Sequence, residues 1–273
     1  MVLSSARPLK SPKGLVSLAV RIGSNKTLVQ GPGGNVSIKE HDGIWVKRSG
    51  TWLEKAKASE IFCFLPKQRV SGRHEYQLAG ELQVSIETPF HTLIPFKCVL
   101  HVHSMGSLTW GLREPTDTTY EVMKKLGLHF APYIKPGIAI ADYIRENPTI
   151  LKSKGIVLAN HGLITWSRTT RGGFRKLMKL EESLLNEAMA VKRNSSDRNT
   201  RVRKYERVPL TPDHAVFFEE NRPNQVWVTE MNAVLVNALN LIPRDQSVCY
   251  LKPEDIVELT TWDAEKIRRA LNE

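Results

Sequence analysis

The sequence predicts an α/β protein, because strand-like and helix-like segments alternate along most of the chain. Short apolar runs with strand character lie at 36–46, 98–103 and 155–161, and segments with helical spacing of apolar residues separate them. Such interleaving is typical of α/β folds. A chain of 273 residues can also bury a full core without disulfides or a structural metal, so a metal-binding pattern in it would serve chemistry rather than folding.

The N-terminal half is predicted to begin with a helix and to continue into a hairpin. Residues 13–24 have the spacing of a short amphipathic helix, and a glycine-rich loop at 31–35 must turn tightly. Apolar–polar alternation on both sides of Asp42-Gly43 predicts a hairpin, since Asp-Gly is a strong two-residue turn signal. The further elements expected here are a helix starting within 53–58, a helix entered from 85–91 and a buried strand at 98–103.

The second half is predicted to hold one more apolar strand and most of the helices. The expected elements are helices at 115–126, 138–147 and 174–193, a strand at 155–161 that 163–166 continues, and C-terminal helices within 210–218, 230–241 and 253–271. The resulting division is a domain at 1–192, a basic linker at 193–207, expected to be mobile, and a C-terminal extension at 208–273.

Charge and cysteine content narrow the class of protein. The formal net charge is +11, but residues 192–207 carry seven basic and two acidic side chains, so much of the excess is one local run. Such runs are usually solvated surface, and no aromatic-interleaved basic motif accompanies them, so nucleic acid is not an expected partner. Three cysteines far apart indicate a reducing cytoplasm, and no apolar run reaches the roughly 18 residues of a membrane span.

Three histidines form the candidate metal site. His101 and His103 are two apart on a predicted strand, where side chains at i and i+2 point to the same face. His161 stands at the end of the second apolar strand, before Gly162. Catalytic zinc typically has three protein ligands and one open position, so these imidazoles could share one ion. The alternative is a pair of packed strand histidines and an unrelated turn histidine.

Two further features could belong to the same site. Glu87 precedes Pro89 at an expected helix start, where a carboxylate often only complements the helix dipole; beside a metal it could instead act as a general base or an additional ligand. The loop at 31–35 could present backbone N–H groups to an anion, although a plain turn is an equally good interpretation. Ser85 and the pair Ser49-Gly50 could add donors.

Taken together, these segments resemble the class II aldolase and adducin family. The resemblance rests on the motifs in their order: Gly31 to Asn35, Ser49-Gly50, Glu87-Thr88-Pro89-Phe90-His91, His101-Val102-His103 and Asn160-His161-Gly162. It covers residues 14–190. The sequence around Ser49 and the Thr211-Pro212-Asp213-His214 segment are most similar to the rhamnulose- and fuculose-phosphate aldolase branch of the family.

The resemblance implies a three-layer α/β/α fold with a central, mainly antiparallel sheet, and a cyclic homotetramer. It implies zinc held by His101, His103 and His161, with Glu87 as the acid/base. The phosphate or acid pocket would be lined by Gly33, Gly34, Asn35, Ser49, Gly50 and Ser85. Pro32 and Gly33 stand where the family often has hydroxyl residues, so the substrate could be a sugar without a phosphate ester, or Lys47 and Arg48 could supply the missing charge.

The implied activity is a metal-dependent lyase reaction, in which an aldolase cleaves or forms a C–C bond of a small sugar or sugar phosphate through a zinc-stabilised enediolate. Epimerase, decarboxylase and dehydratase chemistry on the same scaffold are the alternatives. A non-enzymatic adducin-like scaffold is the alternative from another class, and it would not need the three histidines that this chain keeps.

Overall fold

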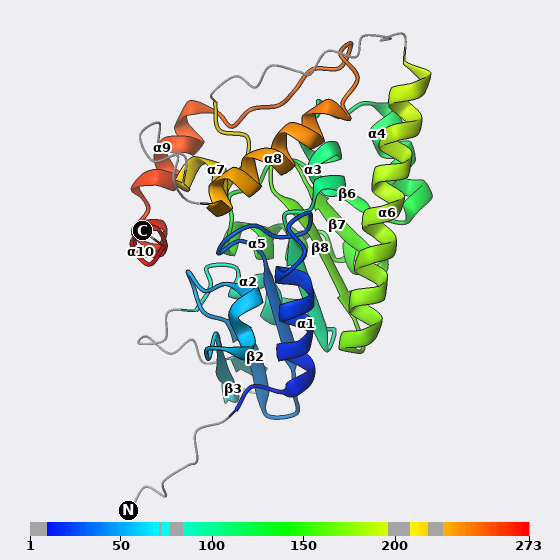
Figure 1. The fold of residues 1–273 in the computed structure, drawn as a ribbon. Helices are drawn as coiled ribbons and strands as arrows, with labels where there is room; N and C mark the ends of the chain where they lie inside the picture. The colour runs from blue at the N-terminus through cyan, green and yellow to red at the C-terminus, as the bar shows by residue number, and fades with distance from the viewer. Residues whose placement is uncertain (1–9, 71–72, 77–83, 196–207, 218–225, 273) are drawn as a thin grey trace, which may run out of the picture.

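A central mixed sheet organises the molecule (Figure 1). The structure, a computed structural model, describes residues 10–70, 73–76, 84–195, 208–217 and 226–272. Within these residues the sheet has eight strands in the order β4-β3-β2-β1-β5-β8-β7-β6. The strands are β1 (Asn35–Lys39), β2 (Gly43–Lys47), β3 (Phe62–Val70), β4 (Arg73–Tyr76), β5 (Cys98–Val102), β6 (His129–Ala131), β7 (Gly155–Leu158) and β8 (Gly162–Ser167). Every pairing except β6 with β7 is antiparallel, which confirms the mainly antiparallel α/β prediction.

Helices pack against the sheet, and further helices form the C-terminal extension. They are α1 (Lys13–Gly23), α2 (Thr88–Leu93), α3 (Met105–Gly111), α4 (Asp117–Leu126), α5 (Ile138–Glu146), α6 (Thr170–Asn194), α7 (Pro212–Phe217), α8 (Val226–Asn240), α9 (Pro253–Thr261) and α10 (Asp263–Ala270), with 3-10 turns at Leu53–Lys57 and Pro148–Lys152. The predicted helix at 13–24, the hairpin around Asp42-Gly43 and the C-terminal helices are confirmed. The α3 helix was not predicted.

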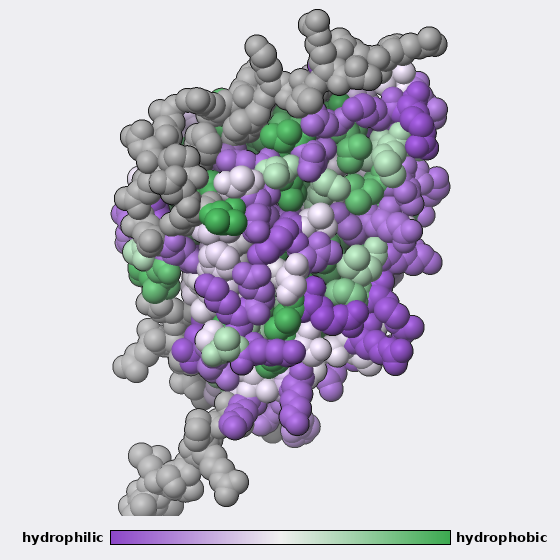
Figure 2. Space-filling view, in the orientation of Figure 1, coloured by the Kyte–Doolittle hydropathy of each residue, from purple (hydrophilic) through white to green (hydrophobic). Residues whose placement is uncertain are grey.

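Alternation along the strands divides the core into two main layers. Leu100 and Val102 of β5 pack in the cluster with α1 and α6, whereas Val99 packs with α2 and α5. His101, between Leu100 and Val102, therefore faces the α2 side, as the period of two along a strand requires. The face in Figure 2 is mainly hydrophilic, with scattered hydrophobic residues between, as expected where amphipathic helices turn their polar sides outward.

The prediction that residues 163–166 continue the strand at 155–161 is wrong. β7 and β8 are separate antiparallel strands, with Leu158 opposite Gly162. The chain reverses there because Asn160 adopts φ +56° and Gly162 φ +154°, conformations that apolar pattern alone does not reveal. His161 consequently lies in a turn, and the following strand pairs with β5, with Val102 opposite Leu163.

The glycine at this turn should be hard to replace. A Cβ on Gly162 would lie 2.3 Å from the carbonyl oxygen of Val102, on a backbone whose φ disfavours other residues. We expect Gly162→Ala to lower the free energy of unfolding by about 2–6 kcal/mol, as the sum of backbone strain and overpacking. Gly14→Ala is the control, since the nearest atom lies 3.5 Å from its added Cβ and helical alanine is favoured over glycine. Urea unfolding of both variants measures the difference. Equal stabilities would contradict the close approach of the Val102 carbonyl oxygen to Gly162.

The domain division at 192/193 and 207/208 stays a prediction. α6 ends at Asn194, so helix occupies the first residues of the predicted linker, and most of that linker lies outside the described residues. The unfavourable Arg171-Gly172-Gly173 sequence lies inside α6, because Thr169 caps the helix by accepting a hydrogen bond from the Gly172 N–H at 3.0 Å. No helix in the described part of the chain has both the length and the hydropathy of a membrane span.

Candidate metal centre and active site

Four buried side chains meet at one point. These are Glu87, His101, His103 and His161, each offering one ligating atom, and those atoms all lie within 4.8 Å of one another. They come from three places in the fold: the residue before α2, the end of β5 and the turn between β7 and β8. The proximity that the sequence predicted for these four residues is therefore present in the fold.

Four of the separations between the ligating atoms are close to those of a metal site. The Nε2 atom of His101 lies 3.0 Å from Nε2 of His103 and 3.3 Å from Nε2 of His161. Glu87 Oε1 lies 3.1 Å from His101 Nε2 and 3.4 Å from His161 Nε2. Tetrahedral zinc with bonds of 2.0–2.1 Å would place its ligands about 3.3–3.4 Å apart, so these residues fit a divalent cation.

Hydrogen bonds on the far side of the rings orient two of the imidazoles. His101 Nδ1 lies 3.2 Å from the carbonyl oxygen of Leu163, which can only accept, so this nitrogen carries the proton. His103 Nδ1 lies 2.9 Å from Asp213 Oδ2, a second acceptor. Both rings, when neutral, therefore direct the Nε2 lone pair inward. Nitrogen lone pairs that point at one another and at a carboxylate repel each other, and a bound cation turns this arrangement into a favourable one.

Charge states in the cluster suit metal binding. Burial by itself would raise the pKa of the Glu87 carboxyl, but the adjacent His101 and His161 outweigh that effect and hold the pKa well below its ordinary value. Burial lowers the pKa of His161 to about 4, more than Glu87 raises it. At neutral pH the site therefore combines an ionised carboxylate with a neutral His161, the forms that bind metals.

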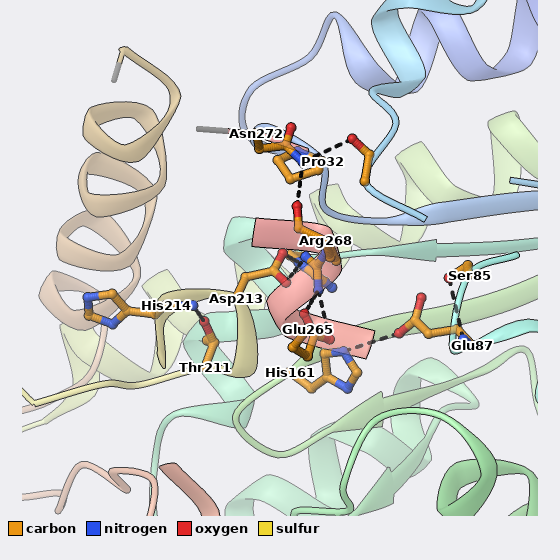
Figure 3. A network of polar contacts seen from close by, with 12 residues as sticks. Pro32, Ser85, Glu87, His161, Thr211, Asp213, His214, Glu265, Arg268 and Asn272 are labelled. Atoms are coloured by element: carbon orange, nitrogen blue, oxygen red, sulfur yellow. Dashed lines mark hydrogen bonds and ion pairs between the residues drawn. The ribbon is translucent and has the colours of Figure 1, made fainter. Parts of the chain in front are cut away.

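Glu87 is not used as a helix cap. It precedes the first residue of α2, as predicted, but its side chain makes no capping hydrogen bond. The carboxylate instead faces the imidazoles, and Figure 3 shows it directed toward His161. This orientation favours a role at the metal centre over the simple dipole-complementing role that local sequence allowed.

A pocket opens beside the cluster. Of the predicted anion-binding residues, Gly33, Gly34, Ser49, Gly50 and Ser85 line it, next to Glu87, His103 and His161. Asn35 does not line it: its side chain is fully buried at the start of β1, opposite His101, and both amide atoms lack a hydrogen-bond partner among the described residues. Its predicted contact with substrate stays a prediction.

Lys47 lines the same pocket and holds the loops together. Its Nζ donates to the carbonyl oxygens of Pro32 at 2.6 Å and Thr51 at 2.9 Å, which ties the glycine-rich loop to the turn after β2. Burial lowers the pKa of Lys47 to about 7. The Lys47 Nζ atom is thus already hydrogen-bonded to two backbone carbonyls. Arg48, the other proposed substitute for the missing hydroxyls, does not line the pocket.

Sequence reasoning missed two charged residues of the pocket, both in the C-terminal extension. Asp213 of α7 contacts His103, and Arg268 of α10 forms an ion pair with Asp213. Burial alone would raise the pKa of Asp213, but Arg268 and His103 hold it far below its ordinary value. The Thr211-Pro212-Asp213-His214 segment was a usable signal for Asp213. No signal marked Arg268, which reads locally as one charge of an i,i+3 pair with Glu265.

Comparison with known proteins found one matching family and solved structures with a similar fold. A sequence model of the family described as "Class II Aldolase and Adducin N-terminal domain" matches residues 15–186. The N-terminal class II aldolase domain of a conserved protein from Thermoplasma acidophilum is 24% identical, with a TM-score of 0.52 over 68% of this chain and 98% of that one. A sugar-phosphate aldolase from Thermotoga maritima is 14% identical, with a TM-score of 0.51 over 67% of this chain and 96% of that one.

A curated protein is also similar in sequence. The "Uncharacterized oxidoreductase YuxG" of Bacillus subtilis (strain 168) is 25% identical over an alignment of 210 residues, which covers 66% of this chain. The match spans only 30% of that protein's length. The two solved structures share the fold, and the family match extends over more than half of the 273 residues, from α1 through most of α6. The chain therefore belongs to the class II aldolase and adducin N-terminal domain family.

Proposed function

We propose that this protein is a metal-dependent lyase of the aldolase type, which cleaves or forms a C–C bond in a small sugar or sugar phosphate. One observation carries the proposal: three imidazoles and the Glu87 carboxylate converge, buried, on a common point at the wall of a pocket. A purely structural or scaffolding role would not require four potential metal ligands to be buried this close together at the wall of a pocket.

The residues divide into two proposed roles. His101, His103 and His161 would hold a divalent ion, with zinc as the proposed metal. That ion would supply a Lewis acid for the carbonyl and hydroxyl oxygens of the substrate. Glu87, ionised and lining the pocket, would accept a proton from the substrate and return it as the bond is broken or made.

The charged or hydroxylated end of the substrate would lie along the glycine-rich side of the pocket. Gly34 and Gly50 adopt φ +65° and +70°, so the backbone turns sharply at both positions, and Ser49 and Ser85 add hydroxyl groups. Turns of this kind can present N–H groups to an anion. These backbone and hydroxyl groups make an anionic substituent the proposed choice, whereas Arg268 in the same pocket is paired with Asp213 and Glu265.

The test is a metal-dependent assay with mass analysis of the products. The protein would be incubated with a panel of ketoses, ketose phosphates and sugar acids, with and without a chelator, and then with zinc restored. Two smaller carbonyl fragments would identify an aldolase. An isomer of unchanged mass would identify an epimerase, loss of carbon dioxide a decarboxylase, and loss of water a dehydratase. No zinc-restored conversion across sugars and sugar acids would contradict the enzyme proposal and favour the scaffold alternative.

The homotetramer is part of the proposal. The structure contains one chain, and the assembly rests on the resemblance to the family. Sedimentation equilibrium of the purified protein measures the mass directly, and a value near four times 30.9 kDa is expected.

A further inference from the structure

The C-terminal extension reaches the metal centre although it lies beyond residues 15–186, which match the family. Asp213, in the first turn of α7, places Oδ2 at 2.9 Å from Nδ1 of His103. The two side chains are only 8% and 9% exposed, so this contact is shielded from water. The two residues are 110 positions apart in the sequence, so only the fold joins them.

His103 differs from the other two imidazoles in its outer partner. The Nδ1 atom of His101 faces a neutral backbone carbonyl, and Nδ1 of His161 is buried without a partner among the described residues. His103 alone of these three faces a carboxylate on that side. A carboxylate that accepts the outer N–H of a metal-binding histidine fixes its tautomer and ring orientation and makes the inner nitrogen a stronger ligand.

Asp213 is itself held in place from two directions. Arg268 of α10 donates a hydrogen bond to Oδ1, which leaves Oδ2 for His103. The same guanidinium is anchored to both Glu265 oxygens, at 3.1 and 3.0 Å. Figure 3 shows Asp213, Arg268 and Glu265 directed toward one another.

The glycine-rich loop leaves room for this contact. A Cβ on Gly33 would lie 2.6 Å from Asp213 Oδ2 and 3.0 Å from His103 Nδ1. Any side chain at that position would push the carboxylate and the imidazole apart. Glycine at position 33 thus leaves the space that the Asp213 carboxylate and the His103 ring occupy.

We propose that Asp213 is a positioning residue for His103, that Arg268 holds Asp213 in place, and that the C-terminal extension thereby completes the metal centre. This inference rests on the proposed function, because it requires an ion at the three imidazoles. A purely structural alternative is that the Asp213–Arg268 pair only ties α7 to α10. The two differ in what they predict for metal affinity.

The experiment compares zinc binding by the full-length protein and three variants. Metal-stripped wild type, Asp213→Asn, Arg268→Met and Asp263→Asn would be titrated against a chromophoric zinc chelator, and their metal-free melting temperatures recorded. We expect Asp213→Asn to weaken zinc binding about 10- to 100-fold, and Arg268→Met to weaken it less. Asp263→Asn is the matched control: it makes the same chemical change on α10, at a side chain 90% exposed that contacts Lys266 instead.

Cobalt substitution adds a readout that a structural role would not move. The visible absorption of the Co²⁺ form should change in Asp213→Asn, because a reoriented His103 alters the ligand geometry, and should stay unchanged in Asp263→Asn. A lower metal-free melting temperature with wild-type zinc affinity and cobalt spectrum would overturn the inference and support the structural alternative.

The outcomes separate this inference from the proposed function. Wild type that binds zinc while Asp213→Asn binds it equally well overturns only the positioning role. Wild type that binds no zinc overturns the metal centre and the inference with it. If Asp213→Asn does not fold, Arg268→Met decides, and wild-type affinity in that variant counts against the inference.

Discussion

Glu87→Gln is expected to reduce turnover about 100- to 10,000-fold, the range typical for loss of a positioned acid/base. Glutamine keeps the size of the side chain but cannot accept a proton. The carboxylate lines the pocket, is held ionised by the adjacent histidines and makes no capping hydrogen bond. We therefore expect near-normal folding, a modest change in zinc affinity and a loss concentrated in kcat, measured on a substrate that the wild type converts.

A matched variant distinguishes this role from a helix-start effect. Glu254 stands exposed in the first turn of α9, where its charge can only favour the helix dipole. Glu254→Gln should cost about 0.3–1 kcal/mol of stability and leave turnover unchanged. If Glu87→Gln behaves like Glu254→Gln, Glu87 has no part in the mechanism.

His103→Ala is expected to remove most of the metal. About one divalent ion per chain should be measured in the wild type after dialysis, by elemental analysis. Four-ligand zinc sites contribute about 10–16 kcal/mol, so one ligand accounts for roughly 3 kcal/mol, or about a hundredfold in Kd. The loss should be larger than in Asp213→Asn, because the ligand itself is absent and Asp213 is left without its imidazole partner.

The control for this variant is another histidine. His41 is exposed in the loop between β1 and β2 and far in sequence from the cluster, so His41→Ala should retain the wild-type metal content. Full metal occupancy in His103→Ala would show that the ion, if present, is held elsewhere.

The sequence predicted the parts of the site that local patterns encode. An i, i+2 histidine pair on an apolar strand, a histidine before glycine and a glutamate before a helix each have a short-range signature. The fold places Glu87, His101, His103 and His161 together, as the resemblance implied. The first hairpin was equally predictable, because Asp42-Gly43 specifies its turn.

Elements that depend on partners distant in the sequence were harder to predict. The α3 helix was not predicted, because it contains two glycines. At its start the N–H of Gly106 donates to the Glu181 carboxylate of α6 at 2.7 Å, and that partner is 75 residues away. The reversal between β7 and β8 depends on backbone angles at Asn160 and Gly162 that apolar pattern does not specify. Asn35 belonged to the predicted pocket by motif, but its buried position in β1 keeps it off the lining.

The sequence was therefore sufficient to predict the fold class, the family and the four potential ligands, because each motif is short and the order of the motifs along the chain resembles the family. The tertiary structure alone decided which groups surround those ligands. Asp213 contacts His103 from α7 and Arg268 contacts Asp213 from α10, and the local sequence around Arg268 resembles that of a solvated surface. Their role depends on burial and on contacts between residues that are 110 positions apart for His103 and Asp213 and 55 apart for Asp213 and Arg268, which the spacing of neighbouring residues does not specify.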